Sequence, residues 1–348
     1  MISRVGIKNF KSIGEPGVDL ELKPLTLLVG PNGGGKSSIL EGISVAIQHG
    51  ITGRLVSFPS WTSILHNLKG PDGHIDIYLA KTASESERGF RTGFGETGGP
   101  HSDKSLTQPL DATASVNAWR GELGTASLIS SVRGNVPYSG DARGNADWVG
   151  VHGENLLLLL ALIFGQLQHR HIEGRIAAWG QRFGINDLNA GFRGGAETGS
   201  EYRDNQLQVA LDLALASAGT RQILTVITQL FWAPKGSLLM IEEPEISLHP
   251  KAQIDVLEMF AEAVTQDDKQ ILATTHSHIL LQALGYVVSK DWLSREDIAV
   301  YHVEKGKGGT KAKQLPLNKS GYIKNWVPSY SKVERQLLRE WAKTLPRK

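Results

Sequence analysis

The stretch Gly30-Pro31-Asn32-Gly33-Gly34-Gly35-Lys36-Ser37 decides the fold of this chain. It matches G-x-x-x-x-G-K-[ST], the pattern of a phosphate-binding loop, or P-loop. Residues 25–29 before it are a short apolar run typical of a buried strand, and apolar residues recur after it at helical spacing from Ile39 to Ile47. A glycine-rich turn that matched this pattern by chance would not need a strand before it and a helix after it. We therefore expect an anion site, where backbone N–H groups and the positive end of a helix face phosphates.

The residues of this loop predict ATP and Mg²⁺ as ligands. Glycines at 33–35 let the backbone approach a phosphate closely and adopt positive φ angles. Lys36 supplies a mobile positive charge for the β- and γ-phosphates, and the Ser37 hydroxyl can bind Mg²⁺. The predicted nucleotide-binding residues on this side are Asn32, Gly33, Gly34, Gly35, Lys36, Ser37 and Ser38.

The composition of the 348 residues excludes several classes of protein. Apolar residues make up 40% and charged residues 21%, which is ordinary for a globular protein of one large domain or two. The chain has no cysteine, which excludes disulfides, thiolate metal sites and cysteine nucleophiles. It begins without a signal pattern, and its longest apolar run, Leu156–Phe164, is too short to span a bilayer. We expect a cytoplasmic protein with no membrane partner.

Charge is distributed unevenly along the chain. Residues 305–348 contain twelve Lys or Arg and two Asp or Glu, a net charge of +10, whereas the remainder carries −8. This basic C-terminal region could contact the phosphates of DNA or RNA. A solvated helix face followed by a basic tail would explain the same charges.

The first half of the chain predicts strands and long loops. The expected elements are a hairpin over Val5–Leu22, a strand over 73–81, a loop-rich insertion over 82–125, a strand over 126–132, a buried helix over 156–168 and a glycine-rich loop over 191–200.

Strands and helices alternate in the second half. The expected elements are a helix over 219–231, a strand over 237–241, a helix from Pro250 past Val264, a strand over 270–275 and a helix from Ser277. This alternation predicts an α/β fold with a mainly parallel sheet flanked by helices, joined to an antiparallel N-terminal β subdomain.

Two adjacent carboxylates follow the strand that ends at Ile241. An apolar strand ending in acidic residues is typical of a Walker B motif. Glu242 can hold Mg²⁺ through its water shell, and Glu243 can accept a proton from the water that attacks the γ-phosphate. Acidic residues also end strands for no catalytic reason, but the P-loop upstream favours the catalytic interpretation.

The segment Ile241–Pro250, which reads IEEPEISLHP, resembles the corresponding segment of the AAA-type ATPases grouped with the OLD, RecF and SMC proteins, which have ABC-type heads. Residues 7–12, IKNFKS, are similar to the opening strand of that group. The resemblance implies a single ABC-type ATPase domain over 1–348. Its expected parts are an N-terminal lobe with the P-loop (1–81), the insertion (82–125), a helical lobe (126–235), the Walker B and switch-histidine segment (236–304) and the basic region (305–348).

The resemblance also implies a signature motif before Walker B. Residues 216–222 contain the S-x-G core as Ser217 and Gly219, although Ala216 replaces the usual leucine. At a helix start these two residues would form a second anion site, and in the family that site caps the γ-phosphate bound by the other subunit. A serine–glycine helix start without a ligand stays open.

Two further residues are placed by resemblance. His276 is similar to the switch histidine of ABC-type ATPases, which can hydrogen-bond the γ-phosphate or the attacking water. No glutamine is convincing at the usual Q-loop position. Residues 130–134 and 149–155 are similar to an "R-G…vG..GEN" segment of related ATPases, which makes Arg133 the candidate there.

The resemblance implies a homodimer that sandwiches two ATP molecules, with higher oligomers left open. Glu243, Lys36 and His276 would act in hydrolysis. Such heads act as switches in DNA repair, plasmid maintenance or anti-phage defence, often with a separately encoded nuclease or toxin. We see no Toprim, HNH or coiled-coil pattern, and so expect a head without its own effector. Two alternatives remain: the ATPase subunit of a membrane transporter, and a non-catalytic nucleotide-binding scaffold.

Overall fold

The computed structural model of the protein contains two compact units. It describes residues 1–47, 66, 73–79, 88–94, 107–109, 123, 125–141, 143, 147–194, 197–204 and 208–344. The unit called here the P-loop unit is drawn from Ile2–Arg120, Thr274–His276 and Leu284–Lys348. The Walker B unit is drawn from Gly121–Ala273 and Ser277–Ala283, together with Met1.

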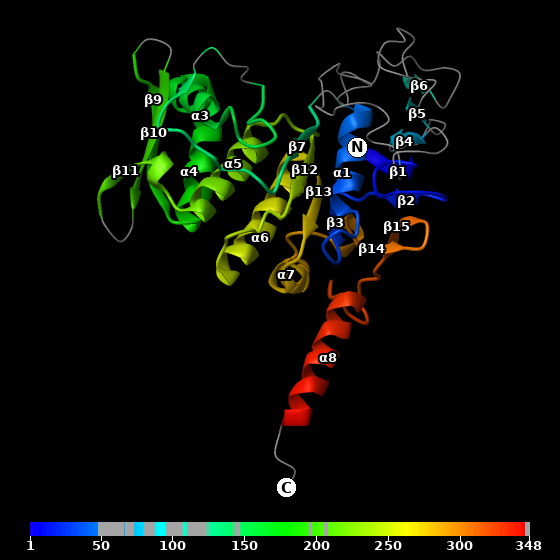
Figure 1. Ribbon diagram of the computed structural model, residues 1–348. Helices are drawn as coiled ribbons and strands as arrows, with labels where there is room; N and C mark the ends of the chain where they lie inside the picture. The colour runs from blue at the N-terminus through cyan, green and yellow to red at the C-terminus, as the bar shows by residue number, and fades with distance from the viewer. Residues whose placement is uncertain are drawn as a thin grey trace. The chain divides into compact units, whose positions relative to one another are not determined.

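An antiparallel sheet forms one part of the P-loop unit and confirms the predicted N-terminal β subdomain. Its strand order is β2-β1-β4-β5-β6 (Figure 1). The strands are β1 (Ile2–Lys8), β2 (Val18–Glu21), β4 (Gly73–Leu79), β5 (Arg88–Phe94) and β6 (Thr107–Pro109). Strands β5 and β6 belong to the predicted insertion over 82–125, most of which lies outside the described residues.

The strand that leads into the P-loop is β3 (Leu25–Val29), and all five of its residues are buried. It pairs in parallel with β14 (Ile298–Gly306), which pairs antiparallel with β15 (Gly309–Gln314). Burial on both faces explains the continuous apolar run in the sequence. The other elements of this unit are α1 (Lys36–Ser44), η6 (Arg295–Asp297), α8 (Pro328–Thr344) and the second half of α7 (His278–Ser289), whose first half belongs to the Walker B unit.

The Walker B unit also contains parallel strands. β12 (Leu238–Glu242) pairs in parallel with β7 (Ser127–Ile129), and β13 (Gln270–Thr275) is its neighbour on the other side. The helices of this part of the chain are α3 (Leu156–Gly165), η4 (Leu167–His169), α4 (Arg170–Arg182), η5 (Leu213–Leu215), α5 (Ala218–Trp232) and α6 (Pro250–Asp267). Parallel strands with flanking helices confirm the predicted α/β class.

The prediction of a glycine-rich loop over residues 191–200 was wrong. β9 (Ile185–Phe192) and β10 (Glu197–Asp204) form an antiparallel pair through this region, with Gly191 opposite Gly199. A Cβ at Gly199 would lie 2.1 Å from Nε of Arg193, so glycine there makes room for a long side chain. Gly199 therefore serves packing on a strand, and Gly194, with a φ of 60°, lies in the short connection between β9 and β10. Composition alone does not distinguish these two roles. Short strands β8 (Gly140–Asp141) and β11 (Ala210–Asp212) also pair with β10.

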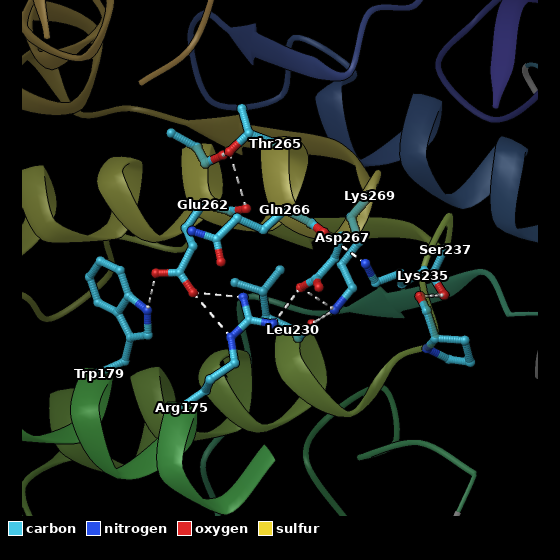
Figure 2. A network of polar contacts seen from close by, with 12 residues as sticks. Arg175, Trp179, Leu230, Lys235, Ser237, Glu262, Thr265, Gln266, Asp267 and Lys269 are labelled. Atoms are coloured by element: carbon cyan, nitrogen blue, oxygen red, sulfur yellow. Dashed lines mark hydrogen bonds and ion pairs between the residues drawn. The ribbon is translucent and has the colours of Figure 1, made fainter. Parts of the chain in front are cut away.

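A partly buried ionic network joins α4 to the end of α6 (Figure 2). Arg175 donates to Glu262 Oε1 from Nη2 at 2.6 Å and to Asp267 Oδ2 from Nη1 at 2.7 Å. Trp179 donates to Glu262 Oε2 at 3.0 Å. Lys269 Nζ lies 3.5 Å from Asp267 Oδ2 and donates to the carbonyl of Leu230 on α5. The Lys269 side chain is only 2% exposed, and this burial lowers its pKa to about 8, against the attraction of Asp267.

We predict that stability depends on pH through Lys269. Because its folded pKa of about 8 lies below its ordinary value of 10.5, the unfolded chain binds more protons between these values. Raising the pH through this window should therefore stabilise the wild-type protein relative to Lys269→Met, by up to about 3 kcal/mol. Denaturant unfolding at several pH values measures the difference. The control is Lys235→Met, because Lys235 is exposed and donates to the nearby Gln266 carbonyl at 3.0 Å. A constant difference between wild type and Lys269→Met across this window would contradict the prediction.

Candidate functional site

The P-loop has the backbone that phosphate binding requires. Gly33 and Gly35 adopt φ angles of 71° and 105°, in the left-handed region that favours glycine. A Cβ at Gly33 would meet nothing within 4 Å, so the loop is open at this point. α1 begins directly afterwards at Lys36, and its N-cap residue Gly35 provides no side-chain cap. The first N–H groups of α1 are thus not taken by a capping side chain, which fits a phosphate ligand.

Lys36 is buried and folds back over its own loop. Its Nζ donates to the carbonyls of Gly30 and Pro31 at 3.0 and 3.1 Å. This holds the ammonium group beside the loop, where a phosphate would meet it. Asn32 and Ser37 are exposed, so both can reach a ligand from solvent.

Two residues that sequence reasoning missed support the P-loop from behind. Thr310 on β15 donates to the carbonyl of Gly34 at 3.1 Å. The hydroxyl of Ser12 lies 2.8 Å from that of Thr310 and donates to Ser38 at 2.9 Å. A Cβ at Gly35 would lie 2.0 Å from Thr310 Oγ1, so this glycine is required by close approach as well as by its φ angle. Ser12 lies in the quoted IKNFKS segment, but no pattern marked Thr310, because it is distant in sequence.

Glu242 and Glu243 occupy different environments at the end of β12. Glu242 Oε2 accepts from the Ser131 N–H at 3.1 Å and from the Ser130 hydroxyl at 3.3 Å. Glu243 adopts a φ of 42°, a left-handed conformation that is rare outside glycine. Strained backbone of this kind persists only where its surroundings hold it, and it concentrates at functional sites.

Arg133 lies beside both glutamates and is only 5% exposed. Its Nη1 donates to the carbonyls of Ser130 and Glu242 at 2.9 and 2.7 Å. Its Nη2 donates to the Glu243 carbonyl at 3.0 Å, and Nε to the Gln222 carbonyl at 3.2 Å. Burial lowers its pKa to about 10, opposed by nearby carboxylates, so the guanidinium stays charged at neutral pH. These hydrogen bonds all end on main-chain carbonyls, and direct nucleotide binding by Arg133 stays a prediction.

The candidate signature residues lie at the start of α5. Ser217 is exposed and caps the helix by accepting from the Thr220 N–H at 3.1 Å. Gly219 is buried, and a Cβ there would lie 2.6 Å from the Ser247 carbonyl, in the segment that follows Glu243. Ser217 is thus placed where a ligand could reach it, and Gly219 where only glycine packs without displacement.

The structure divides the predicted site residues between the two units. The P-loop unit carries residues 32–38 and His276, which is half-buried and directly follows β13. The Walker B unit carries Arg133, Ser217, Gly219, Glu242 and Glu243. Mg²⁺ usually keeps several waters and takes only one or two protein oxygens. The Ser37 hydroxyl and the Glu242 carboxylate have this chemistry, and within the described ranges no cluster of three or more His, Cys, Asp or Glu offers a larger metal site.

The described part of the basic C-terminal region is amphipathic. On α8, the apolar side chains of Val333, Leu337 and Leu338 are exposed alongside Arg335 and Arg339. Contact with DNA or RNA through this region stays a prediction. Among the residues that the structure describes, no helix combines the length and apolarity needed to cross a bilayer.

Comparison with known proteins identifies the family. A family model described as "AAA domain, putative AbiEii toxin, Type IV TA system" matches residues 81–282, more than half of the chain. The chain belongs to this AAA family. A second AAA-domain model matches residues 4–79, which include the P-loop. The two matches together cover the P-loop, the candidate signature residues and the Walker B strand.

The relatives of this AAA protein confirm the predicted resemblance to OLD and SMC proteins. It is 26% identical over 337 residues to the OLD nuclease of Thermus scotoductus, with 80% of this chain and 59% of that protein covered. The chain thus spans less than two thirds of that relative. Among solved structures, it resembles an SMC head bound to the C-winged helix domain of ScpA (TM-score 0.60, 14% identity, 92% and 98% of the chains covered). The SMC head domain of Thermotoga maritima gives a TM-score of 0.53 at 12% identity, with 91% and 99% covered. These likenesses confirm the ABC-type head fold.

We predict that Thr310→Val weakens ATP binding, because it removes the hydrogen bond that supports the Gly34 carbonyl. Loss of one such bond corresponds to about 1 kcal/mol, or roughly fivefold in affinity. Calorimetric titration with Mg-ATP measures it. The matched control is Thr26→Val, a buried threonine near the start of β3 whose hydroxyl bonds to the main chain of Lys23 at 2.9 and 3.2 Å and not to the P-loop. Equal ATP affinities in the two variants would contradict the supporting role.

Proposed function

We propose that this protein is an ATP-hydrolysing switch that controls a separately encoded nuclease or toxin in anti-phage defence or DNA processing. The observation that carries the nucleotide part is the start of α1, where an uncapped helix follows two left-handed glycines and a buried lysine folds over the loop. Main-chain donors and one positive charge at the same place are the chemistry that recognises a triphosphate.

The hydrolysis step is assigned to this chain's own side chains. Lys36 stabilises negative charge on the phosphates, and Glu243 accepts a proton from the attacking water. His276 hydrogen-bonds the γ-phosphate and senses its presence. As the resemblance implies, the Ser37 hydroxyl and the Glu242 carboxylate would be the protein ligands of Mg²⁺, and the ion would neutralise charge on the phosphates.

Two copies of the protein complete each site in this proposal. Ser217 and Gly219 of one copy face the triphosphate held by the P-loop of the other. The exposure of Ser217 at the start of the long helix α5 supports this, since a helix N-terminus favours anions. ATP binding closes the dimer, and hydrolysis opens it.

Control of an effector rests on the resemblance. The OLD relative is named a nuclease. We place the effector activity in a separate protein because the family that the sequence resembles often works with a separately encoded nuclease or toxin. The AAA family match counts against the alternative that this protein is the ATPase subunit of a membrane transporter. Measuring ATP hydrolysis decides the other alternative, a non-catalytic nucleotide-binding scaffold.

We predict that Glu243→Gln lowers kcat at least about 100-fold, the usual contribution of a general base. Because the variant still binds ATP, it should accumulate as an ATP-bound dimer. Phosphate release measures turnover, and light scattering on a sizing column measures mass. The control is Glu41→Gln, which removes a carboxylate that pairs with Lys11 on the surface. Wild-type protein that releases no phosphate, with or without DNA, would overturn the enzymatic proposal. Unchanged turnover in Glu243→Gln would remove Glu243 as the base.

A further inference from the structure

Arg133 joins two segments of the Walker B unit that are far apart in sequence. Its Nη1 and Nη2 hold the carbonyls of Glu242 and Glu243, at the end of β12. Its Nε holds the carbonyl of Gln222, in the second turn of α5. A planar guanidinium with donors in fixed directions suits such a junction, because it can satisfy several carbonyls at once. One buried cation thus links the catalytic segment to the helix that begins beside Ser217.

The Glu243 end of this junction is conformationally unusual. Its φ of 42° places the peptide in a region that needs support from its surroundings. The Arg133 hydrogen bond to the Glu243 carbonyl, at 3.0 Å, is a charge-assisted contact of that kind. Loss of this donor should let the peptide relax and redirect the Glu243 side chain.

A second contact joins the same two segments. Gly219, in the first turn of α5, packs so closely on the Ser247 carbonyl that a Cβ would lie 2.6 Å from it. Ser247 itself has a left-handed φ of 62°. Gly219 therefore attaches the first turn of α5 to the chain that follows Glu243, and Gln222 attaches the second turn to Glu242 and Glu243 through Arg133. A displacement of the start of α5 would therefore move the backbone around Glu243.

We infer that Arg133 is a positioning residue that couples the start of α5 to the backbone of Glu243, so that a ligand at Ser217 helps set the orientation of the catalytic base. This inference rests on the proposed function for its catalytic consequence, but the junction itself does not. In a dimer, it would let the γ-phosphate bound by one copy act through Ser217 on Glu243 of the other. This coupling would make ATP hydrolysis depend on closure of the dimer.

The experiment compares Arg133→Met, which keeps length but removes every donor, with Arg133→Lys, which keeps the charge. We expect Arg133→Met to lower kcat about 10- to 100-fold, the effect of a misplaced catalytic group, with KM for ATP within about threefold of wild type. Arg133→Lys should recover part of the lost kcat. The control for a merely structural defect is Arg175→Met, which breaks the network of Figure 2 and should lower stability without lowering kcat in the folded protein.

Hydrogen exchange without nucleotide gives a readout that does not need hydrolysis. We expect faster exchange in Arg133→Met than in wild type at the amides of residues 219–226, 243 and 245–248. If Arg133→Met does not fold, Arg133→Lys carries both readouts. Wild-type protein that hydrolyses no ATP overturns the proposed function, and exchange alone then tests the junction. Unchanged exchange, or a kcat within twofold of wild type in the folded variant, overturns this inference.

Discussion

Phosphate recognition by main-chain N–H groups needs a backbone that only glycine adopts without strain, and this constraint organises the P-loop unit. Gly33 and Gly35 supply the left-handed angles, and α1 begins where they end. The same loop admits Thr310 behind it, since any side chain at Gly35 would collide with that hydroxyl. The P-loop is therefore open on the side that would face a ligand and closely packed against Thr310 on the other side.

Two buried cations in the Walker B unit, Lys269 and Arg133, are stabilised by different kinds of partner. Lys269 stands near Asp267 and Arg175, in a network that fastens helices to one another. Arg133 instead places its donors on carbonyls around a strained glutamate. Desolvation lowers the pKa of each, to about 8 and about 10 respectively. We interpret Lys269 as a structural element and Arg133 as a positioning residue, because only Arg133 contacts the backbone of the proposed catalytic base.

The sequence predicted what depends on local pattern. The P-loop, the Walker B strand and the alternating strands and helices each lie in short segments with a recognisable period or spacing, and the structure confirms these elements. It did not predict Thr310 behind the loop or the carbonyl partners of Arg133, because these contacts join residues distant in sequence. The glycines near 191–200 were misinterpreted for a related reason, since Gly191 and Gly199 pair across two strands and Gly199 makes room for the side chain of Arg193.

The central claim is that each ATP-binding site contains residues from two copies of the protein. Mixing two inactive variants, Lys36→Ala and Ser217→Arg, tests it most directly, because a mixed dimer contains one site with an intact P-loop and an intact Ser217. Random pairing predicts recovery of roughly a quarter of the wild-type ATP hydrolysis. A mixture that hydrolyses no faster than the two variants measured separately, while each still binds its partner, would contradict the shared site.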